Sequence, residues 1–77
     1  MEEHPDKRGY MPEFTTRMPE LRARKGLTQE QLAELIGASK KTIVRIEKGS
    51  VNPSLRLALD IAHVLEAPVE EIFTYNA

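Results

Sequence analysis

Four cationic side chains gather in one short segment in the middle of the chain: Lys40, Lys41, Arg45 and Lys48. If this segment is helical, Lys41, Arg45 and Lys48 lie along one line of its surface, because residues three and four apart share a helix face. Ile43 and Ile46 then point the opposite way. The spacing therefore predicts a short helix with one basic face and one apolar face.

Such a helix has side chains that suit the edges of DNA bases. Lys40, Lys41 and Thr42 stand at its start, and Arg45 follows one turn later. Lysine and arginine donate hydrogen bonds to O6 and N7 of guanine, and the threonine methyl group can contact the methyl group of thymine. A charged helix face is more often only a solvated surface, so the prediction depends on the elements that position these residues.

The preceding residues predict a second helix in a fixed relation to the first. Thr28 and Gln31 have the spacing of a capping box, in which each residue satisfies a backbone N–H group of the other. Gly37 ends that helix, and Ser39 is a good N-cap for the basic helix, which runs to about Lys48. Two short helices joined by a glycine turn indicate a helix-turn-helix over about residues 28–48.

Three further helices are expected around this pair. One spans about 17–25, with Pro19 tolerated in its first turn, and another spans about 69–73 after Pro68. Between them, a helix after Asn52-Pro53-Ser54 carries a polar stripe, and its leucines and isoleucines are expected in the core. That stripe comprises Arg56, Asp60 and His63. No run of alternating β-branched residues is long enough for a strand, so the predicted fold is all-α.

Length and composition restrict the function further. The chain has 77 residues, which suits one domain, here 15–77, preceded by a flexible arm at 1–14 that has two prolines and no apolar periodicity. There is no cysteine and there are two histidines, so we expect no metal and no cofactor. No membrane span, signal peptide or catalytic motif is present, and we predict a cytoplasmic protein that is not an enzyme.

The net charge of −1 hides a strongly uneven distribution. Residues 1–14 carry a net −2, residues 15–56 a net +5, and residues 57–77 a net −4. Proteins that bind nucleic acid are usually basic, and here the positive charge is concentrated on the block that contains the helix-turn-helix. The overall charge therefore does not exclude a DNA ligand.

The chain resembles the lambda-repressor-like helix-turn-helix family, which includes Cro and cI-type phage repressors and Xre-type regulators. The similar segments are LRARKGLTQEQLAELIG, SKKTIVRIEKG and NPSLRLALDIAHVLEAPVEEIF, which together extend from Leu21 to Phe73. The resemblance implies a compact domain of five helices in which the second and third form the pair that reads DNA.

The resemblance also implies roles for individual residues. Lys40, Lys41 and Arg45 match base-reading positions, and Thr42 lies between them. Gln29, Ser39 and Lys48 match positions that contact the DNA backbone. Arg22 and Glu47 match a partly buried ion pair between the first and third helices, which gives them a structural role.

These observations predict a sequence-specific regulator of transcription that binds double-stranded DNA, acting as a repressor and as a homodimer on a pseudo-palindromic operator. Two half-sites require a twofold partner, and Ile72, Phe73 and Tyr75 could form the seam or instead pack on the domain's own core. One alternative is an antitoxin-type module that binds a protein partner through Val69 to Tyr75 and regulates its own gene. Another is a structural domain without DNA contacts.

Overall fold

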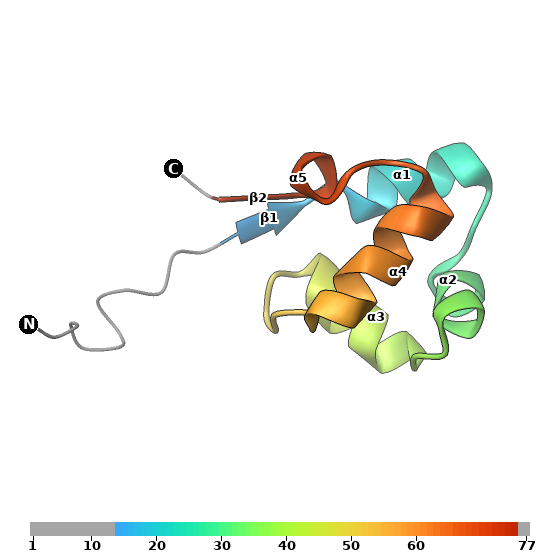
Figure 1. Ribbon diagram of the computed structural model, residues 1–77. Coiled ribbons are helices and arrows are strands. Elements are labelled where there is room, and N and C mark those ends of the chain that lie inside the picture. The colour runs from blue at the N-terminus through green and yellow to red at the C-terminus, as the bar shows by residue number, and fades with distance from the viewer. Residues whose placement is uncertain (1–13, 76–77) are drawn as a thin grey trace, which may run out of the picture.

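The computed structural model describes residues 14–75, and residues 1–13 and 76–77 lie outside this range. Within the described residues, five helices and two short strands follow one another (Figure 1). Their order is β1 (Phe14–Thr16), α1 (Met18–Lys25), α2 (Gln29–Ile36), α3 (Lys40–Glu47), α4 (Leu55–Leu65), α5 (Val69–Ile72) and β2 (Phe73–Tyr75). The predicted arm at 1–14 thus falls outside the described residues except for Phe14.

The two strands correct the prediction of an all-α fold. β1 and β2 form an antiparallel ribbon in which Thr15 lies opposite Thr74, and the two hydroxyl oxygens are 3.1 Å apart. Phe14 packs edge-to-face on Phe73 with ring centroids 6.2 Å apart. Three-residue strands carry almost no periodic signal, and their pairing joins opposite ends of the chain. Phe14, predicted to belong to the arm, is therefore part of the folded domain.

The predicted helix starts and stops are present in the structure. In the capping box, Thr28 Oγ1 accepts a hydrogen bond from Gln31 N–H over 3.0 Å, and Gln31 Oε1 accepts one from Thr28 N–H over 2.9 Å. Ser39 caps α3 and Ser54 caps α4 in the same manner, each through its side-chain oxygen. These local bonds satisfy donors that would otherwise lack partners at the helix N-termini.

A single apolar core holds the five helices together. α4 lies at its centre and contacts α1, α2 and α5. The buried cluster consists of Met18, Leu21, Leu32, Ala33, Ile43, Ile46, Ile61, Leu65 and Ile72. Because Ile43 and Ile46 belong to this cluster, α3 is anchored by one face and leaves the opposite face to solvent.

One prediction about apolar side chains is wrong, and for Ile72 the alternative of packing on the domain's own core holds. Leu55 and Leu59, expected in the core, are 76% and 52% exposed, because they form a stripe of α4 separate from that of Ala58, Ile61 and Leu65. Ile72, a candidate for the dimer seam, is fully buried within the domain. Of the three seam candidates only Tyr75 is largely exposed, since Phe73 is half-buried against Phe14.

Candidate nucleic-acid interface

The helix-turn-helix is formed by α2, a short turn and α3. α2 ends at Gly37, whose φ of 72° places it in the left-handed region that glycine tolerates, and Ala38 N–H bonds back to Ala33 C=O over 2.9 Å. Ser39 then begins α3 directly. This turn sets the angle between the two helices and fixes which face of α3 is left uncovered.

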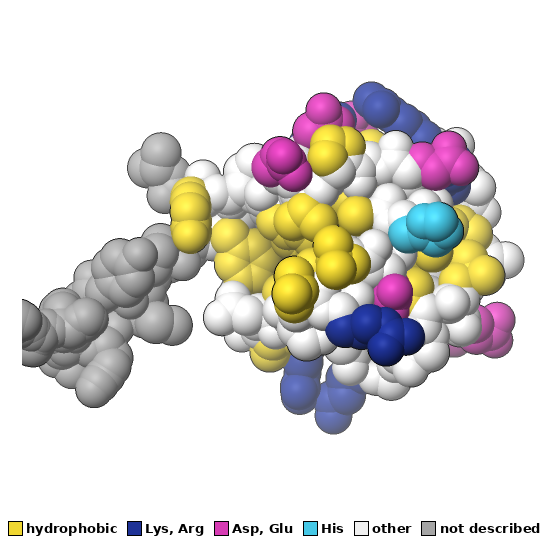
Figure 2. All heavy atoms as spheres, viewed as in Figure 1, with side chains coloured by type: hydrophobic (Ala, Val, Ile, Leu, Met, Phe, Trp, Pro, Cys, Tyr) yellow, Lys and Arg dark blue, Asp and Glu magenta, His cyan; other side chains and the backbone are white. Residues whose placement is uncertain are grey.

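The uncovered face of α3 carries the predicted base-reading residues. Lys40, Lys41 and Arg45 are exposed, and Thr42 is half-buried. Figure 2 shows Lys and Arg side chains projecting from the lower edge of the molecule, where α3 lies in Figure 1. Among residues 14–75, none of these three cations forms an ion pair with a carboxylate. The arrangement leaves their donors available for an anionic or acceptor-rich ligand.

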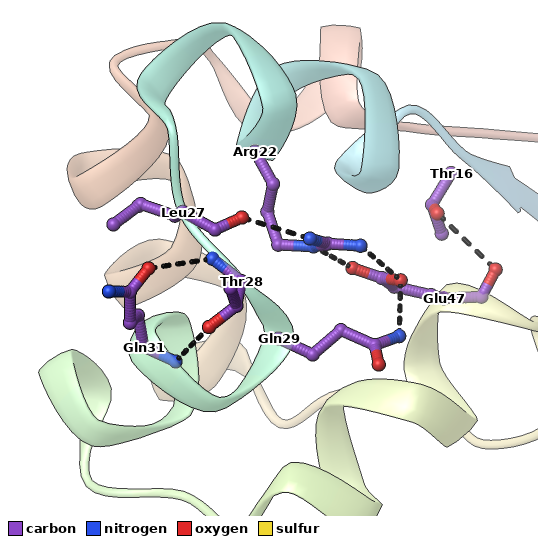
Figure 3. Close-up of polar contacts among 7 residues, drawn as sticks. All are labelled: Thr16, Arg22, Leu27, Thr28, Gln29, Gln31 and Glu47. Carbon is purple, nitrogen blue, oxygen red and sulfur yellow. Dashed lines mark hydrogen bonds and ion pairs between the residues drawn. The ribbon is translucent and has the colours of Figure 1, made fainter.

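The acidic side chain of α3 is turned away from this surface and neutralised. Glu47 is 7% exposed, and Arg22 of α1 approaches it with Nε at 2.6 Å from Oε2 and Nη2 at 3.2 Å from Oε1 (Figure 3). Arg22 Nη1 also donates to Leu27 C=O over 3.0 Å. The two-pronged ion pair ties α1 to the end of α3 and to the loop before α2.

Gln29 belongs to the same network, which the sequence did not indicate. Its Nε2 donates to Glu47 Oε1 over 2.9 Å, and its side chain is half-buried between α2 and α3 (Figure 3). One N–H of the Gln29 amide is therefore already hydrogen-bonded within the protein. The residues are 18 positions apart, and no local pattern relates them, so only the packing of α2 on α3 reveals the contact.

The remaining predicted backbone-contact residues lie at the two ends of α3. Ser39 Oγ accepts from Thr42 N–H over 3.1 Å and lies 3.0 Å from Thr42 Oγ1, so both hydroxyl groups take part in the cap. Lys48 is exposed at the C-cap. Both flank the basic face of α3.

Several other charges are paired away from α3. Lys25 Nζ lies 2.7 Å from Glu66 Oε1, and this hydrogen bond lowers the pKa of Glu66 below its ordinary value. Arg17 lowers the pKa of Glu20 in the same way. These pairs join acidic groups of the domain to cations outside the helix-turn-helix.

Other kinds of site find little support within residues 14–75. No three His, Asp or Glu side chains in this range gather as a metal-binding group would require. No helix in the same range has the length and apolarity needed to cross a membrane.

The capped helix pair, with an anchored apolar face and an open basic face on its second helix, defines the helix-turn-helix class. The family model described as helix-turn-helix matches residues 20–72. The chain belongs to this family, as the resemblance to lambda-repressor-like regulators implies.

Known relatives support the same assignment. An uncharacterised HTH-type transcriptional regulator of Archaeoglobus fulgidus is 51% identical over 61 residues, covering 79% of this chain and 87% of its own length. Bacillus subtilis YgzD, another uncharacterised HTH-type regulator, is 44% identical over 57 residues, which cover 74% of this chain and 86% of YgzD. Both are similar over most of their length.

A solved structure shows the same fold. The restriction-modification controller protein C.AhdI of Aeromonas hydrophila superposes with a TM-score of 0.65 at 40% identity, covering 71% of this chain and 83% of that one. The protein is thus a DNA-binding helix-turn-helix regulator of transcription.

Proposed function

We propose that the protein recognises a specific double-stranded DNA sequence and represses transcription as a homodimer on a pseudo-palindromic operator. The observation that carries this proposal is the exposed basic face of α3, whose cations form no ion pair within residues 14–75, opposite its buried isoleucines. An α-helix fits the major groove of B-DNA, where each base pair has a distinct pattern of donors and acceptors. The protein would act without enzymatic chemistry, in the cytoplasm, by occupying its site.

The side chains of α3 divide into two roles in this proposal. Lys40, Lys41 and Arg45 read base edges, and Thr42 supports them from the same turn. Lys48, beyond the end of α3, contacts phosphate groups and sets the position of the domain on the duplex. The division follows from position, since residues near the start of a recognition helix enter the groove most deeply.

Gln29 and Ser39 are proposed to contact the DNA backbone from the starts of α2 and α3. The Gln29 amide keeps one N–H after its bond to Glu47, and its backbone N–H stands in the first turn of α2, where helix donors lack intrahelical partners. The bond to Glu47 holds this amide in one place before DNA arrives. Such preorganisation reduces the entropy lost on binding.

The test is selection of bound sequences from a random DNA pool, followed by two matched variants. We expect a symmetric motif. Arg45→Ala should relax the preference at one or two base pairs, by about 1–3 kcal/mol, because it removes a base contact. Lys48→Ala should weaken binding to all sequences alike and reduce the salt dependence of binding by about one unit of slope.

Uniform loss of affinity in both variants across the selected library would contradict the assigned roles. Absence of any enriched motif would contradict sequence-specific binding itself. A reporter gene placed behind the selected motif tests repression, because expression should fall when the protein is supplied and recover with Arg45→Ala.

The antitoxin-type alternative receives less support from the structure. It uses the segment from Val69 to Tyr75 as a docking surface, but Ile72 is buried in the domain and Phe73 is half-buried. Of the apolar side chains in this segment, Tyr75 alone is largely exposed. We therefore do not propose a protein partner at this segment.

A further inference from the structure

One apolar side chain of α3 lies on the basic side of the helix. Val44 stands one turn after Lys40 and one turn before Lys48, and residues four apart share a helix face. Lys41 and Arg45 occupy the neighbouring line of the same surface, and both are exposed. Val44 therefore lies among the four cations of α3 and its C-cap.

The core of the domain does not account for this valine. Ile43 and Ile46 are fully buried, whereas Val44 is half-buried. Within residues 14–75 it belongs neither to the buried cluster nor to the apolar side chains that pack against that cluster. Single apolar side chains are common on protein surfaces, but valine also disfavours a helix, because its branched side chain loses rotamer freedom there. Neither core packing nor helix propensity therefore explains Val44.

A valine at this position matches one feature of the major groove. Thymine presents a methyl group there, beside its O4 acceptor, and an apolar side chain can contact that methyl group. The cations around Val44 only donate hydrogen bonds, so they suit acceptors such as guanine O6 and N7 and leave a methyl group without a partner. Valine has one strongly preferred χ1 rotamer in a helix, so its own methyl groups lose little freedom on contact.

The contact assigned to Val44 is distinct from the role of Thr42. Residues two apart point about 200° away from each other around a helix, so the two side chains flank the basic face on opposite sides. Thr42 also takes part in the cap of α3, since its N–H donates to Ser39 Oγ over 3.1 Å and its Oγ1 lies 3.0 Å from the same atom. The two residues therefore cannot substitute for each other at one base.

We propose that Val44 is a specificity-determining residue, which contacts the 5-methyl group of a thymine in each half-site, beside the bases that the cations of α3 contact. The proposal rests on the proposed function, since it requires α3 to lie in the major groove. It adds an apolar contact to the donors of Lys40, Lys41 and Arg45. Through this contact the protein distinguishes thymine from a base that has no methyl group.

The first experiment replaces the thymines of the selected motif by uracil, one at a time and in one half of the duplex. Uracil keeps the hydrogen-bonding groups of thymine and lacks only its methyl group. At one position the wild-type chain should bind about fourfold more weakly, which corresponds to one methyl group that is no longer buried. Fluorescence anisotropy at one fixed salt concentration measures the affinities, because phosphate contacts make binding depend on salt.

The second experiment compares variants on the same thymine and uracil duplexes. Val44→Ala should bind the thymine duplex more weakly than wild type and should bind both duplexes equally. Val44→Ile should keep the difference between them, because it keeps both branches of the side chain. Leu35→Ala is the matched control, since it truncates an exposed apolar side chain of α2 and should also keep the difference. Alanine favours a helix, and circular dichroism confirms that the variants fold.

Three outcomes would overturn the inference: a selected half-site without thymine on either strand, no thymine at which uracil weakens binding, or the same thymine–uracil difference in Val44→Ala as in wild type. Failure of the proposed function is observed separately, because the selection then enriches no motif, and the thymine contact fails with it. An enriched motif whose thymines are not coupled to Val44 removes the thymine contact alone and keeps sequence-specific binding.

Discussion

Single glycines determine how closely the chain can pack around the ends of the helices. Gly49 follows α3 with a φ of 76°, and a Cβ atom there would lie 2.9 Å from Phe14 C=O in β1. Gly26 has a similar φ of 68°, but a Cβ atom there meets nothing within 4 Å. The two glycines therefore share a backbone conformation and differ in what lies beside them.

This difference gives a prediction with an internal control. Gly26→Ala should lower the free energy of unfolding by about 1 kcal/mol, through the left-handed backbone alone. Gly49→Ala should cost about 1–3 kcal/mol more than that, because β1 must also shift away from the loop after α3. Urea unfolding of both variants measures the difference, and equal losses would show that β1 does not press on Gly49.

The ion pair between Arg22 and Glu47 permits a second prediction. Arg22→Leu should lower the free energy of unfolding by about 3–5 kcal/mol, because it leaves the nearly buried Glu47 carboxylate without its cation. Arg22→Leu combined with Glu47→Leu should recover much of this loss, since neither charge then remains buried. A double variant as unstable as the sum of the single ones would contradict this account.

At the scale of elements, the ends of α1 and α4 are joined by the pair of Lys25 and Glu66. The pKa of Glu66 is lowered by the hydrogen bond from Lys25, so the folded protein holds this carboxylate ionised at a lower pH than the unfolded chain does. The resulting stability is complete above the unfolded pKa of about 4.5 and is lost as the pH falls through the folded value.

Glu66→Gln should therefore reduce the acid sensitivity of the fold. Thermal unfolding followed from neutral pH to about pH 3 should show a smaller fall in midpoint for this variant than for wild type. Glu70→Gln is the control, because Glu70 is exposed on α5 and makes no ion pair among residues 14–75. A wild-type curve that Glu66→Gln leaves unchanged would contradict the role of this pair.

Helices and their caps are the elements that sequence patterns predict well. Each helix cap joins a side chain to a backbone N–H group within one helical turn, so the caps depend only on neighbouring residues. The capping residues are Thr28, Gln31, Ser39 and Ser54. Sequence patterns do not indicate the strands β1 and β2, because each has three residues and pairs with a segment about 60 residues away in the chain. Local signals predict helices, whereas pairing over such a distance depends on how the core brings the chain ends together.

At the scale of the whole molecule, the basic and acidic parts of the sequence occupy different elements of the fold. The basic block from 15 to 56 contains α3, and the acidic block from 57 to 77 contains most of α4 together with α5 and β2.

The central position of α4 explains why some of its apolar side chains are buried and others are exposed. Ala58, Ile61 and Leu65 fill the small core, and within the described range 14–75 no element covers Leu55 and Leu59.

Sequence alone was sufficient for the helix-turn-helix, its caps, the opposite faces of α3 and the family, because each depends on residues close together in the chain. Tertiary structure decided which charged and apolar side chains stay exposed. It buried Glu47 against Arg22 and Gln29, placed Ile72 in the core and left Leu55 and Leu59 in solvent. Burial depends on which helices meet, and segments distant in sequence determine that in a core this small.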